Sequence, residues 1–496
     1  MKPLGTITMC FPYVDEVTRH SLQLVMDDSE NFGDFAERLC EKVCLEESPP
    51  LLEYLAFFFP FHMEHFYLTD RLKAAARVPD LAEPLYLITT ALKGTVVKWD
   101  EMRQSLRKAL AAAPNDWIAT HLYLRWRYLA DEMFPECDVN LKPINALTRN
   151  VNENAELEFF KSHLIRIQAQ TAIRENKRKE AIEQLSKAIT IARRHDDQIV
   201  VAALLIYLAN QIKHSNLKRA IDILLGARDL SKQLGYRYNI GHIQHELGHI
   251  LAFRGELNAA FEHQLEYQRV SESVGYPEPS LNALLALYLN QMGNGAEALG
   301  LATIAVENSE SYPRLEAFIH SQLAYALINL ERFEEAKSEI ALTQETATKS
   351  GDTTQFRWFP IVEGILDKAE GRFDAAIDCF RTVLDGIKED SDPLIQNICL
   401  LNLADMEIAG LSGAEVDRLP SQFGPWMKAL EDYVQKNDFP GIAAQSLIIK
   451  AKLYHKLGKF DEVRRTIKEV QRISEAPSMR YLNDFVLTAF PDIVVS

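Results

Sequence analysis

An alanine recurs at nearly constant spacing through the middle of the chain. The series is Ala181, Ala220, Ala260, Ala298, Ala336 and Ala376. Successive members are 39, 40, 38, 38 and 40 residues apart. A period in this range is typical of repeat proteins, in which one small unit is stacked many times because it cannot bury its apolar face alone. The spacing therefore predicts one repeat array where 496 residues would otherwise suggest two to four globular domains.

Two further marks keep the same phase as the alanines. A small residue precedes most of them by twelve positions, and a residue that favours turns precedes them by five. The small residues are Ala169, Gly248, Ala286, Ala324 and Gly364, with Ala451 before a late member at Val463; the turn residues are Asn176, Ser215, Gly255, Gly293, Gly371 and Gly458. Leu208 and Glu331 are the exceptions. A small residue allows two antiparallel helices to approach closely, and Gly or Asn ends a helix in the left-handed conformation. Each unit is therefore predicted to be a helix, a turn and a second helix.

This pattern resembles the tetratricopeptide repeat in its longer form, which occurs in the sensor arms of MalT-type regulators. The resemblance covers about residues 153–477, with room for one degenerate unit in the 87 residues between Ala376 and Val463. It implies an all-α fold, an α-solenoid whose first helices line a concave groove. Residues 1–152 are predicted to form a helical N-terminal domain, possibly of degenerate repeats, with the junction at 149–155. Residues 478–496 are predicted to form a capping helix and tail.

The segment HIQHELGH, residues 242–249, contains H-E-x-x-H, the pattern that places two zinc ligands and a glutamate base on one helix of a metallopeptidase. The repeat explains part of it, because Gly248 is the small residue of its unit and Glu246 falls at an ordinary polar position. A third ligand is missing from the pattern. The downstream candidates, Glu262, His263 and Glu266, are expected on the second helix, away from the groove. We therefore predict no metal, no cofactor and no catalytic residue.

The resemblance also implies which side chains face the groove, namely those six before, three before and one after the small residue. The candidate binding residues are His163, Arg166, Gln170, His242, His245, His249, Phe318, Ser321, Tyr325, Trp358, Gln445, Lys452 and His455. This mixture of donors and aromatic side chains suits an extended peptide, and in particular an acidic segment, because Arg, Lys and His bind carboxylates while aromatic rings supply contact area.

Composition limits the other classes of function. The chain holds 54 Lys and Arg against 70 Asp and Glu, a net charge of −16, so it is not expected to bind nucleic acid. No apolar run reaches the roughly 18 residues of a membrane span. The six cysteines form no disulfide framework, which predicts a cytoplasmic protein. Cys40 and Cys44, one helical turn apart, are predicted to be buried apolar residues, and His62 and His65 to lie in the core or at its rim.

The sequence thus favours a non-enzymatic scaffold that binds a protein or peptide in its groove. Two alternatives stay open. One is a zinc-dependent hydrolase that uses His245, Glu246 and His249. The other is a peptide or small-ligand sensor with a regulatory output, as in receptors that pair a helical N-terminal domain with such repeats.

Overall fold

The computed structural model describes residues 16–42, with gaps at 32, 33, 36 and 40, and residues 160–491, with short breaks at 175–176, 214, 274–279, 310–314, 351–352, 388–391 and 412–423. Every regular element in these ranges is a helix, which confirms the predicted all-α class. Most of the predicted N-terminal domain lies outside the described residues, apart from α2 (Glu16–Asp27) and a few residues after it. Cys40, Cys44, His62, His65, Asn176 and the junction at 149–155 also lie outside them.

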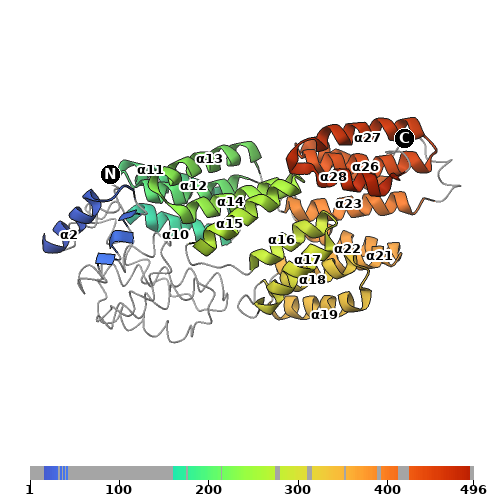
Figure 1. Cartoon of the computed structure of the whole chain (residues 1–496), viewed down its shortest axis with the longest axis horizontal. Helices are drawn as coiled ribbons and strands as arrows, with labels where there is room; N and C mark the ends of the chain where they lie inside the picture. The colour runs from blue at the N-terminus through green and yellow to red at the C-terminus, as the bar shows by residue number, and fades with distance from the viewer. Residues whose placement is uncertain are drawn as a thin grey trace. The chain divides into compact units, whose positions relative to one another are not determined.

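The helices from residue 160 onward follow one another as hairpins, each a first helix, a tight turn and a second helix (Figure 1). The pairs are α10 (Phe160–Arg174) with α11 (Arg178–Arg194), α12 (Gln198–Ile212) with α13 (Leu217–Leu234), α14 (Arg237–Phe253) with α15 (Leu257–Ser273), α16 (Ser280–Gln291) with α17 (Gly295–Glu307), α18 (Glu316–Asn329) with α19 (Phe333–Ser350), α21 (Trp358–Ala369) with α22 (Phe373–Gly386), α23 (Pro393–Ala409) with α25 (Pro425–Lys436), and α26 (Pro440–Lys456) with α27 (Phe460–Ser474). The short α20 (Thr353–Phe356) precedes α21, and a 3-10 turn (Pro477–Met479) and α28 (Tyr481–Ala489) follow α27. The predicted tetratricopeptide-like solenoid is confirmed, and α23 with α25 occupies the place of the degenerate unit.

The repeating alanines mark where the second helix of each hairpin packs on the first. All six of them, and Val463 in the same position, have no exposed surface. The small residues opposite are equally buried, and at Gly248 an added Cβ would lie 2.7 Å from Nε2 of Gln264 and 3.2 Å from the carbonyl oxygen of Ala260. Leu208, the exception to the small-residue rule, is also buried, at 8% exposure. The repeated alanines and small residues thus lie at the positions where the two helices of each hairpin cross.

The turn residues adopt the backbone conformation that the pattern predicts. Gly255, Gly293, Gly371 and Gly458 have φ angles of 74°, 83°, 79° and 68°. Glu331 takes the same left-handed conformation, with φ of 58°, although it carries a side chain. Ser215, in the corresponding position of an earlier unit, does not. The backbone conformation of most turns is therefore determined by the repeat, and the residue type determines only how much conformational free energy that conformation requires.

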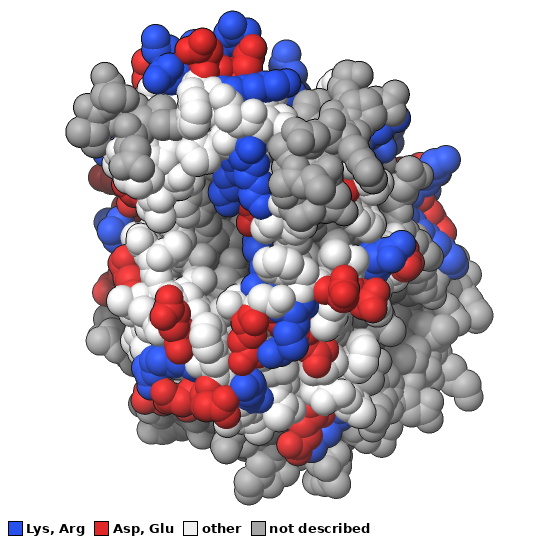
Figure 2. All heavy atoms as spheres, turned by 90° about the vertical axis from the view of Figure 1, so that its right-hand side faces the viewer, with Lys and Arg blue, Asp and Glu red and all other residues white. Residues whose placement is uncertain are grey.

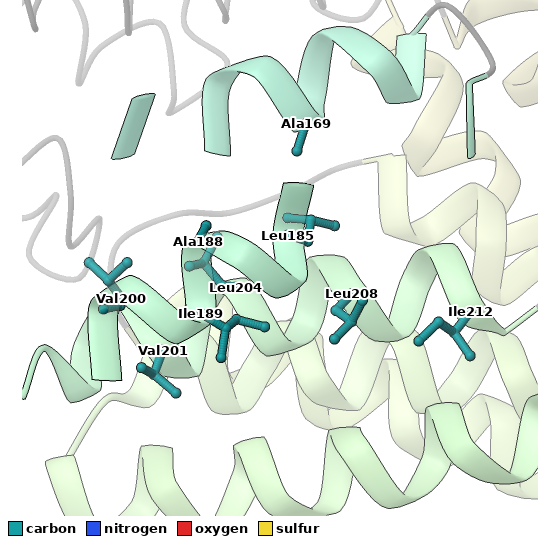
Figure 3. Close-up of a cluster of buried hydrophobic side chains, with 10 residues drawn as sticks. Ala169, Leu185, Ala188, Ile189, Val200, Val201, Leu204, Leu208 and Ile212 are labelled. Carbon is teal, nitrogen blue, oxygen red and sulfur yellow. The ribbon is translucent and has the colours of Figure 1, made fainter. Parts of the chain in front are cut away.

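The structure divides into two compact units. Unit 1 comprises residues 1–246 and 266–278, and unit 2 comprises residues 247–265 and 279–496. In unit 1 the apolar side chains of three successive helices meet, as expected for stacked hairpins (Figure 3). The buried residues shown there are Ala169 of α10, Leu185, Ala188 and Ile189 of α11, and Val200, Val201, Leu204, Leu208 and Ile212 of α12.

Unit 2 departs from nearest-neighbour stacking at the turn between α14 and α15. The carbonyl oxygen of Phe253 accepts a hydrogen bond of 2.8 Å from Nδ2 of Asn397, which lies 144 residues further along the chain. The carbonyl oxygen of Arg254 accepts one of 2.9 Å from the backbone N–H of Gly441. A hairpin turn in an open solenoid would contact only the next hairpin, so this turn has a second set of partners.

Substitution of Glu331 by glycine is expected to stabilise the protein by about 1 kcal/mol, because a side chain in the left-handed conformation is sterically strained. Chemical denaturation of Glu331→Gly measures this. The matched control is Ala341→Gly on the exposed side of α19, which should destabilise by about the same amount. A loss of stability in both variants would contradict the strain at Glu331.

Substitution of Gly248 by leucine should destabilise the protein by about 1–3 kcal/mol, because the new side chain would overlap Gln264 where α14 crosses α15. Thermal unfolding provides the measurement. Gly300→Leu is the control, since Gly300 lies in α17 with nothing within 4 Å of an added Cβ. Equal melting temperatures for Gly248→Leu and the wild type would rule out a tight crossing at this position.

Candidate functional site

Glu246, the central acid of the HELGH stretch, is buried against the preceding repeat. It is 7% exposed. Its carboxylate accepts a hydrogen bond of 2.6 Å from Nδ2 of Asn210 on α12 and pairs at 2.9 Å with Nζ of Lys213, which follows the last residue of α12. The interpretation of Glu246 as an ordinary polar position is therefore wrong: the side chain ties two first helices together. A carboxylate held in this way is not directed at a metal-bound water.

The histidines of the same stretch pack against aromatic rings. The rings of His242 and His245 lie 5.5 Å and 4.9 Å from the ring of Tyr267 on α15, centroid to centroid. His249 lies 6.5 Å from Phe253 in its own helix. All three are half-buried. Across the described part of the chain, no group of three or more His, Cys, Asp or Glu side chains is placed to hold a metal ion.

Several other predicted binding residues serve packing or hydrogen bonds within the chain. Arg166 is 4% exposed, and Ser321 is fully buried and donates to the carbonyl oxygen of Phe318 at 2.6 Å. Tyr325 is half-buried, and desolvation raises the pKa of its hydroxyl to about 12. Phe318 and Trp358, from α18 and α21, come together with ring centroids 4.8 Å apart. The side chains of His163 and Gln170 in α10 lie outside the described residues.

The three predicted residues of α26 have different surroundings. Gln445 donates from Nε2 to the hydroxyl of Tyr481 at 2.8 Å. His455 is exposed, and its ring lies 5.6 Å from that of Phe460 and 6.0 Å from that of Phe490. Lys452 pairs at 2.7 Å with Oδ1 of Asp405 on α23. Of the three, only Lys452 belongs to a charged cluster that runs from one repeat to the next.

That cluster spans the first helices of three successive hairpins. Oδ2 of Asp405 lies 2.7 Å from Nζ of Lys368 on α21, so the carboxylate sits between two lysines. Lys368 also donates to Oδ1 of Asn402 at 2.9 Å. One turn beyond Lys452, Lys456 donates to the carbonyl oxygen of Ala409 at the end of α23, at 2.7 Å. We call Lys368, Lys452 and Lys456, with Asp405 among them, the lysine row.

The lysine row has an excess of positive charge. Burial raises the pKa of Asp405, but the charges of Lys368 and Lys452 outweigh this and lower the pKa to about 2, so the carboxylate is ionised. The remaining acids of these helices point elsewhere: Glu363 contacts Cys379 of α22, Asp367 pairs with Arg372 at the turn, and Glu407 accepts from the N–H of Met427 in α25. Two of the three lysines therefore share one carboxylate and Lys456 binds backbone carbonyls, in a chain whose net charge is −16.

Asparagines continue this arrangement on the two preceding first helices. Nδ2 of Asn290 on α16 donates to the carbonyl oxygen of Gln322 on α18 at 3.0 Å. Nδ2 of Asn329 on α18 donates back to the carbonyl oxygen of Asn290 at 3.1 Å. Polar side chains near the carboxyl ends thus link α16 to α18, and α21 and α26 each to α23.

A signal for these residues was present in the sequence. Asn290 and Lys368 each lie four residues after the small residue of their unit, and Asn329 and Lys456 lie five after it. Apart from His455, the positions chosen from the resemblance lie one residue after the small residue or earlier, and these positions miss Asn290, Asn329, Lys368 and Lys456. Asp405 carried no such signal, because its unit lacks the repeat marks.

Figure 2 views the molecule from the side of the C-terminal hairpins, and the face shown is hollowed. Lys and Arg side chains gather along the margin of the hollow, among uncharged surface, while Asp and Glu lie mostly lower on the face and at its edges. In the described ranges, no helix is long and apolar enough to cross a membrane.

Comparison with known proteins identifies similar folds. The sequence matches no family model and no curated protein sequence. Among solved structures, the chain is similar to a Rap protein complexed with competence and sporulation factor (11% identity, 81% of this chain and 98% of that one, TM-score 0.38). It is also similar to aspartyl phosphate phosphatase F from Bacillus subtilis (11%, 79% and 93%, 0.40) and to yeast Tom70 (12%, 92% and 92%, 0.35). At these identities and TM-scores, the similarity concerns the fold alone.

Substitution of Asp405 by asparagine is expected to destabilise the protein by about 2 kcal/mol at pH 7, because two partly buried lysines lose their counter-charge. The folded pKa lies below the unfolded value of about 3.9, so the stabilisation is present above that value and is lost as the pH falls towards 2. Urea unfolding at pH 7 and pH 3 should show the difference between variant and wild type shrinking at the lower pH. A constant difference would contradict the lowered pKa.

Proposed function

We propose that the chain is a non-enzymatic, cytoplasmic scaffold that binds an extended acidic segment of a partner protein along the first helices of its C-terminal repeats. The observation that carries this proposal is the lysine row. It places three ammonium groups and one carboxylate on three successive first helices, in a protein that is otherwise strongly acidic.

Charge and partial exposure support an acidic partner. The side chains of Lys452 and Lys368 are 40% and 26% exposed, so each ammonium group can exchange water for a carboxylate oxygen while it stays paired with Asp405. Ammonium–carboxylate hydrogen bonds are among the stronger polar contacts. The partial burial of the row reduces screening by salt relative to an open surface.

The spacing of the row supports an extended segment. Neighbouring helices in packed repeats lie roughly 8–10 Å apart, and an extended chain advances by about 3.3 Å per residue. Carboxylates two to three residues apart along the partner would then meet lysines of neighbouring first helices. The exposed amide of Asn329 extends the polar surface to α18, and this side chain is bonded in turn to the buried Asn290 of α16.

The zinc-hydrolase alternative receives no support from the described geometry. Glu246 would have to act as the general base, and its carboxylate is engaged by Asn210 and Lys213. His242 and His245 pack on Tyr267. These contacts are those of a first helix that packs on its neighbours.

The test is binding of a ten-residue oligoglutamate peptide to the full chain, measured by fluorescence anisotropy at low salt. Replacing Lys452 and Lys456 together by glutamine should weaken binding about thirtyfold, because two charge-assisted hydrogen bonds that contribute roughly 1 kcal/mol each are lost. Binding should also weaken as salt is raised.

The matched control is the double variant Lys428→Gln, Lys468→Gln. It removes the same net charge from exposed positions on the second helices α25 and α27. Equal weakening in the two double variants would show that net charge alone governs binding, and the proposed site would then be rejected.

A further inference from the structure

The turn between α14 and α15 is held by donors from three later helices. The carbonyl oxygens of Phe253, Arg254 and Gly255 accept, in order, from Nδ2 of Asn397 on α23, the N–H of Gly441 on α26 and the hydroxyl of Tyr481 on α28, at 2.8, 2.9 and 2.8 Å. The N–H of Tyr481 also donates to Oδ1 of Asn258 at 3.1 Å. We call these four hydrogen bonds the clasp. Carbonyls at the end of a helix lack partners within the helix, and here three helices supply them.

The contact within the clasp is backbone against backbone. A Cβ added to Gly441 would lie 2.1 Å from the carbonyl oxygen of Gly255, and one added to Gly255 would lie 2.7 Å from the nitrogen of Ile442. Gly255 also has a φ of 74°, which disfavours any side chain. Both glycines are therefore required by this contact, although only Gly255 belongs to the repeat pattern.

Tyr481 connects the turn to α26 as well as to α28. Its hydroxyl donates to Gly255 and accepts from Nε2 of Gln445, and the residue is 3% exposed. Burial raises the pKa of this hydroxyl, so it stays protonated and remains a donor. Two of the four clasp hydrogen bonds therefore depend on α28 being in place.

The helix α28 is the element of the clasp that can detach most easily. It has nine residues, and a helix of this length is not stable by itself in water. Its buried residues are Tyr481, Leu482 and Val486, whereas Leu487 is 49% exposed. A short element with few buried residues opens at a lower free energy than longer, more deeply buried helices.

The clasp and the lysine row act on the same two helices. Asn397 and Asp405 lie on α23, and Gly441 and Lys452 lie on α26. At 1.5 Å per residue, the row lies roughly 12 Å beyond the clasp along α23 and roughly 16 Å beyond it along α26. The turn binds both helices through adjacent carbonyls, so it fixes their separation at one end, while the pair between Asp405 and Lys452 joins them further along.

We infer that the clasp is a conformational device through which the C-terminal helix α28 sets the separation of α23 and α26, and with it the geometry of the lysine row. With α28 docked, four hydrogen bonds hold the turn, and the separation of α23 and α26 keeps Asp405 and Lys452 paired. With α28 detached, two of them are lost and the helices separate more readily. The effect on α23 and α26 stands by itself, and its consequence for binding rests on the proposed function.

Hydrogen–deuterium exchange of the full chain tests the structural part. Tyr481→Phe removes only the hydroxyl, and Gly441→Ala forces the turn away without changing α28 or a lysine. In both variants we expect exchange to rise at least fivefold in peptides covering 251–258 and 441–445, and to rise also in 402–409 and 449–456, where the row lies. Peptides from α18 and α19 should not change. The control is Leu487→Ala, which alters an exposed side chain of α28.

The same variants are then titrated with the oligoglutamate peptide. We expect Tyr481→Phe and Gly441→Ala to weaken its binding at least threefold and Leu487→Ala to leave it unchanged. Wild-type exchange over 441–445 in Tyr481→Phe would overturn the role of α28. Faster exchange there with unchanged affinity for the peptide would overturn the coupling to the row. If the wild type does not bind the peptide, the proposed function is rejected. The coupling of the clasp to the lysine row is then decided by exchange over 402–409 and 449–456. Exchange at the wild-type rate in these peptides of Tyr481→Phe and Gly441→Ala would overturn the coupling.

Discussion

Close approach of two helices inside each hairpin is the contact on which the rest of the structure depends. Seven positions at the start of the second helices have no exposed surface, and six of the seven are alanine. A larger residue there would move the helices apart, and each hairpin would then present a different surface to the next. Because the same crossing is repeated, asparagine side chains reach from α16 to α18 and back, and lysine side chains reach from α21 to α23 and from α26 to α23.

The sequence predicted the packing within each hairpin well, since this packing depends on residue size and on backbone conformation at fixed spacing. The left-handed turns at Gly255, Gly293, Gly371 and Gly458 are found where the pattern placed them. Even Glu331, which breaks the residue rule, keeps the conformation, because the packed helices on either side determine the path of the chain. Local patterns therefore recovered the fold, and tertiary packing explains the exception.

The candidate site was recovered only in part, because it depends on contacts between repeats. Lys452 was identified from its phase, but its partner Asp405 lies in the hairpin without repeat marks, so nothing in the sequence pointed to it. Glu246 shows the opposite error. Glu246, two positions before the small residue, was interpreted as an ordinary polar position, yet it is buried against Asn210 of α12 and Lys213 at the end of that helix. Side-chain partners 33 to 47 residues away cannot be read from a repeat pattern alone.

Contacts of still longer range give unit 2 a property that stacking alone does not provide. In a linear array, stability is a sum over neighbours, and a disturbance at the last helix affects only the hairpin beneath it. Tyr481 instead contacts a turn 226 residues earlier, and that turn also binds α23 and α26. Release of one terminal helix therefore weakens the attachment of two internal ones. Those two helices carry Asp405 and Lys452. The docking of α28 therefore affects the position of these charged residues, although α28 is not in contact with them.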